Sequence, residues 1–262
     1  MFLLTGIAWF YYLIIFLLGL SLGSFINSWV WRTRENLGIV RARSMCPRCR
    51  YVVRWHDNIP LLSFFALRGR CRNCERRIIW QYPAVELWGG VLFLAVTVWH
   101  GLGPWIFSLE LIRDWVVLIF LTFVFIYDLQ YRQILNFTTL LPAGVLFFLA
   151  IVFGWQDASA MLLGVLAGSG FFLLLYLLSK GAWIGGGDVR LGLFMGVILG
   201  WPKILVALLF AYIIGATVSL GLILLKKKTL KSETPFGTYL VIGTMIAMFY
   251  GERISNWYLG LL

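Results

Sequence analysis

The sequence predicts an all-α polytopic membrane protein with about eight transmembrane helices and one small polar domain. Hydrophobic residues make up 61% of the 262 residues, and the mean hydropathy is +0.89. Soluble domains contain only about 45–50% apolar residues. Apolar runs also recur along the whole chain, several of them long enough to cross a hydrocarbon core of about 30 Å. Together these observations exclude an ordinary soluble fold.

The apolar runs define the predicted spans. They cover about residues 7–30, 82–99, 115–127, 134–153, 158–179, 191–199, 204–225 and 234–250. No small-residue cleavage site follows the first run, so we expect a retained helix and not a removed signal peptide. We expect an N-terminal region, residues 1–100, that contains two spans and the polar loop at about 31–80. Residues 101–262 then form a six-helix membrane domain.

Positive charge is concentrated in the polar loop. The net charge is +11, but 12 of the 22 Lys and Arg residues fall between Arg32 and Arg77. Cytoplasmic loops of membrane proteins carry such an excess, which explains the charge without a nucleic-acid partner. We therefore expect the loop in the cytoplasm, both termini outside, and the lipid bilayer as the protein's surroundings.

All four cysteines lie in this loop, as two Cys-x-x-Cys pairs separated by 21 residues: Cys46, Cys49, Cys71 and Cys74. This spacing predicts a tetrahedral zinc site, because each pair offers two thiolates and the intervening chain can fold back. Disulfides are the alternative, and a reducing cytoplasm disfavours them. Four thiolates leave no open position for a reactive water, so the predicted zinc site is structural.

Two aspartates stand at the ends of apolar runs. Asp128 ends the run at 115–127, and Asp188 follows three glycines, of which Gly185 and Gly187 flank the middle one. A carboxylate at a helix centre within the membrane costs about 2.5–3.5 kcal/mol on insertion scales, so such residues usually have a function. Two predicted spans separate the aspartates. Both side chains are therefore expected at the same cytoplasmic boundary.

Paired carboxylates can perform acid–base chemistry. Two that share a small site do not both ionise, so one can accept a proton from water while its protonated partner polarises a peptide carbonyl. The neighbouring glycines let a substrate backbone approach closely and can take backbone angles that other residues avoid. An ion-coupled carrier is the alternative, although carriers usually bind near the bilayer midplane within repeated halves. A zinc-dependent scaffold is a third reading, and it leaves the aspartates unexplained.

Two further polar residues lie in the first two spans. Asn27 shares a small-residue face with Gly19, Gly23 and Ser24, which indicates either helix packing or substrate contact. Glu86 lies at the cytoplasmic mouth of the second span, where it either has a functional role or interacts with the helix dipole.

These motifs together resemble those of the bacterial type IV prepilin peptidase family, membrane aspartic peptidases with a Gly-x-Gly-Asp motif. The resemblance extends from Gly19 to Gly243. Its segments are residues 23–27 with Arg32, the cysteine loop with 57–60, residues 82–87, Asp128, residues 185–188, and the Pro235-Phe236-Gly237 motif. Presenilin-like proteases share Gly-x-Gly-Asp but have no reason to carry the cysteine loop. One departure is Leu135, where the family often has proline.

The resemblance implies a reaction and its site residues. It implies that Asp128 and Asp188 cleave the basic leader of a prepilin or pseudopilin at the cytoplasmic face of the bacterial inner membrane. It also implies methylation of the new N-terminus with S-adenosylmethionine, bound in the region of Glu86. Candidate substrate contacts are Gly185, Gly187, Asn27, Glu86, Pro235, Phe236 and Gly237. The identity of the pilin, its pathway and the oligomeric state stay open.

Overall fold

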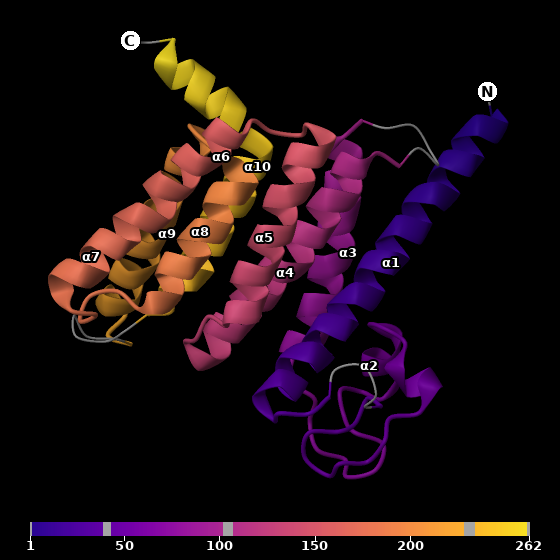
Figure 1. Cartoon of the computed structure of the whole chain (residues 1–262). Coiled ribbons are helices and arrows are strands. Elements are labelled where there is room, and N and C mark those ends of the chain that lie inside the picture. Colours follow the sequence, from indigo (N-terminus) through magenta and orange to yellow (C-terminus); the bar gives the residue numbers. More distant parts are fainter. Residues whose placement is uncertain (1, 39–42, 102–106, 228–233, 261–262) are drawn as a thin grey trace. The chain divides into compact units, whose positions relative to one another are not determined.

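The computed structural model describes residues 2–38, 43–101, 107–227 and 234–260, with the side chains of residues 2–8 and 259 left undescribed. Residues 39–42 of the predicted polar loop therefore lie outside the described part. The chain forms two compact units, Met1–Trp115 and Val116–Leu262. Both are helical (Figure 1), and the described residues contain no strand, only isolated β-bridges. The predicted domain division at residue 100 stays a prediction.

Two long helices, α1 (Phe2–Arg34) and α3 (Gln81–Trp99), form the framework of the first unit. Glycines bring their backbones together. A Cβ atom added at Gly19 would lie 2.8 Å from the Cα of Gly90, and one added at Gly23 would lie 2.6 Å from the Val85 carbonyl oxygen. Side chains larger than hydrogen do not fit at such distances. This confirms the predicted packing role of these glycines.

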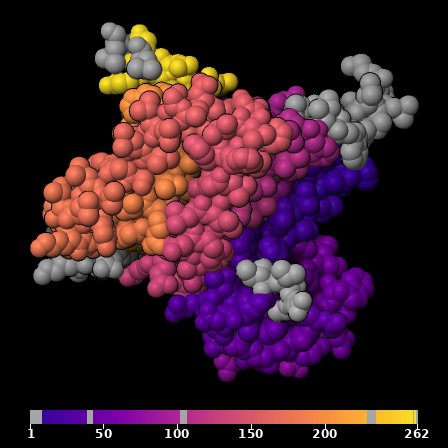
Figure 2. All heavy atoms as spheres, in the orientation of Figure 1, coloured from indigo at the N-terminus to yellow at the C-terminus, as the bar shows by residue number. Residues whose placement is uncertain are grey.

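The loop between these helices contains a 3-10 turn, η1 (Trp55–Asn58), and a short helix, α2 (Leu62–Ala66). Two isolated antiparallel bridges, Met45↔Val52 and Arg70↔Arg77, close its two cysteine turns. In the space-filling view this purple part of the chain forms a compact body next to the indigo α1 (Figure 2). The loop therefore has a defined fold although its sequence has no long apolar run.

The second unit surrounds one central helix. Its elements after α4 (Leu109–Tyr131) are α5 (Asn136–Phe153), α6 (Ala158–Val165), the π-helical turn η2 (Leu166–Gly170), α7 (Phe171–Ser179), α8 (Gly186–Leu199), α9 (Lys203–Leu224) and α10 (Phe236–Leu259). Helix α8 contacts α5, α6, α7, α9 and α10. Gly168 and Gly192 make its contact with η2 possible, because a Cβ at Gly168 would lie 2.7 Å from the Gly192 carbonyl oxygen.

Five helical segments in the described part are long and apolar enough to cross a membrane: Trp9–Arg34, Gln81–Trp99, Asn136–Phe153, Ala158–Ser179 and Lys203–Leu224. The other predicted spans correspond to α4, α8 and α10, so the total of about eight stays a prediction. Several helices extend beyond their expected spans. Helix α4 begins at Leu109, α8 begins at Gly186, and α10 continues to Leu259. In each case polar residues or glycines extend the helix beyond its apolar run.

The close approach of α1 and α3 predicts a difference between two glycine substitutions. Gly23→Ala places a methyl group against the backbone of α3, and overpacking of this kind destabilises by roughly 1–3 kcal/mol. Gly144→Ala on α5 is the matched control, because no atom lies within 4 Å of the added Cβ. Thermal unfolding in detergent should show a lower midpoint for Gly23→Ala alone. Equal midpoints for the two variants would contradict the close helix contact.

Candidate active site

Asp128 lies in the last turn of α4 and is 4% exposed. Its Oδ2 atom accepts a hydrogen bond from the backbone N–H of Thr238 at 2.9 Å. Thr238 belongs to the first turn of α10, where backbone N–H groups have no partner within the helix. The positive end of the helix dipole also favours a carboxylate there. Asp128 therefore caps α10 and connects two helices that are far apart in the sequence.

Asp188 lies in the first turn of α8, where it is half-buried. Gly185 precedes the helix in an extended conformation, with φ −76° and ψ 149°. None of the glycines at 185–187 has a positive φ, so the expectation of unusual backbone angles was wrong. Gly187 is instead needed for close contact, because its added Cβ would lie 3.0 Å from the Cβ of Ile134. The first turn of α8 can thus approach the chain that follows α4.

Position 237 also requires a glycine for steric reasons. A Cβ atom at this position would lie 2.8 Å from Asp128 Oδ2 and 2.8 Å from Ile134 Cδ1. A glycine here leaves room for the carboxylate to reach the start of α10. Gly185 differs from both, because its added Cβ would meet nothing closer than 3.9 Å. The protein's own packing therefore does not require a glycine at 185.

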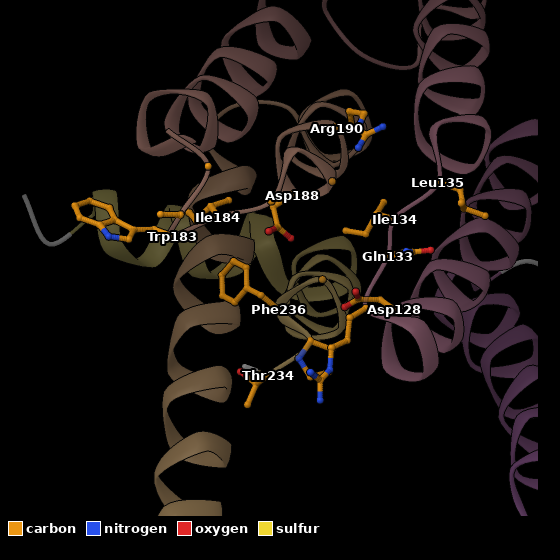
Figure 3. A pocket seen from close by; sticks show the side chains of 17 residues that line it. Asp128, Gln133, Ile134, Leu135, Trp183, Ile184, Asp188, Arg190, Thr234 and Phe236 are labelled. Atoms are coloured by element: carbon orange, nitrogen blue, oxygen red, sulfur yellow. The ribbon is translucent and has the colours of Figure 1, made fainter. Parts of the chain in front are cut away.

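Asp128 and Asp188 line one pocket of about 620 Å³. In Figure 3 the two carboxylates face the same space, with Ile134 and Phe236 beside them. The pocket is formed by the α4–α5, α7–α8 and α9–α10 connections. The count of predicted spans placed both aspartates at one boundary, and the folded unit brings them together. Of the predicted contact residues, the pocket includes Gly185, Gly187, Pro235, Phe236 and Gly237.

Several pocket residues were missed by the sequence reasoning. The apolar ones are Ile134, Leu135, Trp183 and Ile184, and the polar ones include Arg132, Gln133, Arg190 and Thr234. All lie within eight residues of an aspartate or of the Pro235-Phe236-Gly237 motif. That nearness along the chain was the available signal. Arg190 Nε donates to the Gly186 carbonyl at 2.9 Å.

Leu135, where the chain departs from the family pattern, precedes α5 with φ −89° and ψ 142°. Its carbonyl oxygen accepts a hydrogen bond from the Thr138 hydroxyl at 2.8 Å. The first turn of α5 therefore forms without proline at this position.

The four cysteine sulphur atoms lie within 4.8 Å of one another, and those of Cys46 and Cys74 are 4.0 Å apart. A tetrahedral zinc ion with Zn–S bonds of about 2.3 Å requires sulphur atoms about 3.8 Å apart. Both cysteine turns have the same backbone pattern. Arg50 N–H donates to the Cys46 carbonyl and Glu75 N–H to the Cys71 carbonyl, each at 2.9 Å, and both donors have a positive φ. The four thiols thus fit one metal ion.

A salt bridge holds η1 on the second cysteine turn. Arg72 donates to both carboxylate oxygens of Asp57, at 2.8 and 2.7 Å. These hydrogen bonds keep the pKa of Asp57 below its usual range. His56 lies 3.7 Å from the Asp57 carboxylate and outside the cysteine cluster. His56 is therefore a neighbour of the metal site and not one of its candidate ligands.

Glu86 connects the loop to the helix pair. Its carboxylate is 9% exposed and accepts the backbone N–H of Leu61 at 2.8 Å, together with a hydrogen bond from the Ser24 side chain. Leu61 has a positive φ of 60°, which is uncommon for a branched residue and indicates local strain. The Glu86 contact stabilises this turn. Glu86 thus joins α3, α1 and the loop.

Asn27 lies about one turn from Ser24 on α1. Its amide Nδ2 donates to the Tyr82 carbonyl at 3.1 Å, whereas its buried Oδ1 atom has no hydrogen-bond partner among the described residues. A buried acceptor of this kind is uncommon in native structures. Asn27 and Glu86 belong to the first unit, and the aspartate pocket belongs to the second.

The capping role of Asp128 predicts different stabilities for two variants. Asp128→Ala leaves the buried N–H of Thr238 without an acceptor, which costs about 1–3 kcal/mol. Asp128→Asn keeps an acceptor oxygen and should lose less stability. Thermal unfolding of the two purified variants measures the difference. If Asp128→Ala unfolds at the same temperature as Asp128→Asn, the cap does not stabilise the fold.

Comparison with known proteins identifies the family. Residues 17–100 match the bacterial peptidase A24 N-terminal domain, and residues 115–220 match the type IV leader peptidase family. The chain is 33% identical to the prepilin leader peptidase/N-methyltransferase of Aeromonas salmonicida strain A449, over 97% of this chain and 96% of that protein. It is 31% identical to the protein of the same name from Bacillus subtilis strain 168, over 94% and 97%.

A third relative, from Legionella pneumophila, carries the same name and is 31% identical over 98% of both chains. No solved structure is significantly similar to the chain. The similarity to these relatives extends over nearly the whole chain. We conclude that the chain belongs to the type IV leader peptidase family, as a relative of the prepilin leader peptidase/N-methyltransferases.

Proposed function

We propose that this protein cleaves the basic leader of type IV prepilins or pseudopilins and methylates the new N-terminal residue. The observation that carries the proposal is the single pocket in which Asp128 and Asp188 meet, in a chain of this family. A carrier or a scaffold would not account for the family similarity. The membrane domain, residues 101–262, is then the peptidase part and contains both aspartates.

Cleavage uses the aspartates as an acid–base pair. The ionised carboxylate takes a proton from a water molecule as its oxygen attacks the scissile carbonyl carbon. The protonated carboxyl group donates a hydrogen bond to the carbonyl oxygen, on which negative charge develops. The C–N bond of the resulting tetrahedral intermediate then breaks, and the departing nitrogen takes up a proton. The products are the leader with a new carboxylate and the mature pilin with a new amine.

The pocket supports this chemistry in two ways. Thr238 N–H holds Asp128 through Oδ2, which fixes the orientation of this carboxylate. The apolar side chains of Ile134, Trp183 and Phe236 line the same space and suit a hydrophobic residue next to the scissile bond. A pocket with a few polar groups among apolar ones is typical of small-molecule and peptide sites.

We place the protein in the bacterial inner membrane, with eight spans and the pocket facing the cytoplasm. The charges at the ends of the helices support this orientation. Arg132 follows α4, Lys180 follows α7, and Lys226 and Lys227 follow α9. The C-terminal ends of these three helices lie at the same end of the second unit (Figure 1). Cytoplasmic ends of spans carry such an excess of basic residues.

Zinc is the metal that best fits the cysteine cluster, and it would hold the two cysteine turns together. Cys46→Ser and Cys74→Ser should each lower the zinc content of purified protein from about one ion per chain. Arg48→Ala is the matched control, because Arg48 is exposed in the same turn and offers no thiolate. Elemental analysis gives the zinc-to-protein ratio. Unchanged zinc in both cysteine variants would show that the cluster is not the site.

S-adenosylmethionine supplies an electrophilic methyl group when bound, and the new pilin amine accepts it. We place this step in the region of Glu86 and Asn27. The buried Oδ1 atom of Asn27, which lacks a hydrogen-bond donor, supports the placement because an amino group would satisfy it. Glu86 accepts hydrogen bonds from the Leu61 N–H and from the side chain of Ser24, which lies about one turn from Asn27 on α1. The residues present therefore fit a ligand that carries an amine.

Mass spectrometry of a prepilin incubated with the purified protein tests both activities. Wild type should remove the leader, and a further gain of one methyl group should require S-adenosylmethionine. Asp128→Asn and Asp188→Asn should leave the prepilin uncut, because each removes one partner of the acid–base pair. Full cleavage by either variant would exclude that aspartate from the reaction. An uncut prepilin with folded wild type would contradict the peptidase assignment.

Substitution of Gly185 tests whether the substrate contacts the chain at this position. Gly185→Ala has room within the protein and an allowed φ, so the fold should be unchanged. Its methyl group enters the pocket, and we expect kcat/KM for prepilin cleavage to fall about tenfold or more. Gly186→Ala is the control, since its added Cβ meets nothing within 3.8 Å and Gly186 is not among the pocket residues. Equal kinetics for the two variants would argue against close substrate contact at Gly185.

A further inference from the structure

The cysteine loop exposes large apolar side chains. Leu62 and Phe65 of α2 are 68% and 64% exposed, and Ile79 and Trp80 are 67% and 69% exposed. We call these four residues the α2–Trp80 face. Contiguous exposed apolar residues of this size mark an interaction site more often than chance surface composition. No step of the proposed reaction uses them.

The position of this face in the sequence indicates its depth relative to the membrane. Trp80 directly precedes α3, which is one of the five candidate spans. A residue at the start of a span lies at the membrane–water interface, where tryptophan is enriched. Phe64 of α2 packs against Trp80 with ring centroids 5.0 Å apart. Helix α2 is therefore held at the same level as Trp80.

The apolar surface continues from the loop onto α3. Leu87, Trp88 and Val91 are 47%, 45% and 47% exposed, and they follow Trp80 by seven, eight and eleven residues. These spacings place them on the same face of a helix as Trp80. On a membrane span an exposed apolar face of this kind contacts lipid. The exposed apolar residues of α3 thus begin about two turns after Trp80, on the side of the helix where Trp80 lies.

Basic residues flank the face along the sequence. Arg68 and Arg70 follow α2, and Arg76 and Arg77 precede Trp80, all of them exposed. Glu75 is the one acidic residue in this stretch. Arginine guanidinium groups bind phosphate well, and basic residues next to a span attract anionic lipid headgroups. The charge of the surroundings therefore matches an anionic membrane surface.

We propose that the α2–Trp80 face docks on the anionic surface of the membrane. Leu62 and Phe65 lie at the level of the headgroups and the first acyl carbons, and the four arginines bind lipid phosphates. Cys71 and Cys74 lie between Arg70 and Arg76 in the sequence, so docking also holds the second cysteine turn at the bilayer surface. The inference does not depend on the proposed peptidase and methyltransferase activities.

Photo-crosslinking of the full chain in lipid nanodiscs tests the proposal. The residue p-benzoylphenylalanine is placed at position 65, in discs that contain phosphatidylcholine and phosphatidylglycerol. After irradiation, mass spectrometry should find lipid attached to the peptide that contains residue 65. The same probe at position 148 is the positive control, because Phe148 is 65% exposed on the α5 span. The absence of lipid adducts at position 65 would overturn the proposal. So would crosslinks from position 65 to residues 116–262 or to a second copy of the chain.

The charge requirement has its own measurement. In the position-65 probe protein, the double substitution Arg76→Gln and Arg77→Gln should lower the ratio of phosphatidylglycerol to phosphatidylcholine adducts. The expected fall is up to about 25-fold, because each of the two basic residues near the surface contributes a factor of about five. Arg48→Gln is the matched control and should leave the ratio unchanged. An unchanged ratio in the double variant would show that the arginines do not recruit anionic lipid.

Discussion

The hydrogen bond between the Asp128 carboxylate and the Thr238 backbone N–H is the contact on which the second unit depends. A buried carboxylate needs donors, and the first turn of a helix has N–H groups without partners. At the junction of α4 and α10, the Thr238 N–H supplies the donor and the Asp128 carboxylate supplies the acceptor. The same bond orients one of the two carboxylates in the pocket. The same hydrogen bond therefore stabilises the fold and orients a carboxylate for the proposed chemistry.

Glycines make the other close contacts possible, and they do so by their small size. Gly237 leaves space for Asp128 at the start of α10, and Gly187 brings the first turn of α8 against Ile134. Gly23 has the same function where α1 crosses α3. Gly185 is different, because no atom of the described residues lies closer than 3.9 Å to a Cβ added there. We propose that a substrate enters that space. A substitution at Gly185 therefore tests substrate contact without disturbing the packing of the protein.

Much of this arrangement could be predicted from the sequence, because apolar runs and cysteine spacing are local signals. The count of spans between Asp128 and Asp188 placed both at one boundary, and the Cys-x-x-Cys pairs predicted one cluster. The sequence could not reveal that α8 begins at Gly186, because the glycines there read as a loop. Nor could it reveal that Glu86 binds the Leu61 N–H, since that contact depends on a strained turn 25 residues away. Contacts between distant segments need coordinates.

The central claim is that Asp128 and Asp188 act on one peptide bond. An experimental structure of Asp188→Asn with an uncleaved prepilin tests it most directly, because the variant should bind substrate without turnover. We expect the scissile carbonyl within hydrogen-bond reach, about 2.6–3.2 Å or one water molecule, of both residue 188 and Asp128. A scissile bond bound outside this pocket, or near only one of the two residues, would contradict the account.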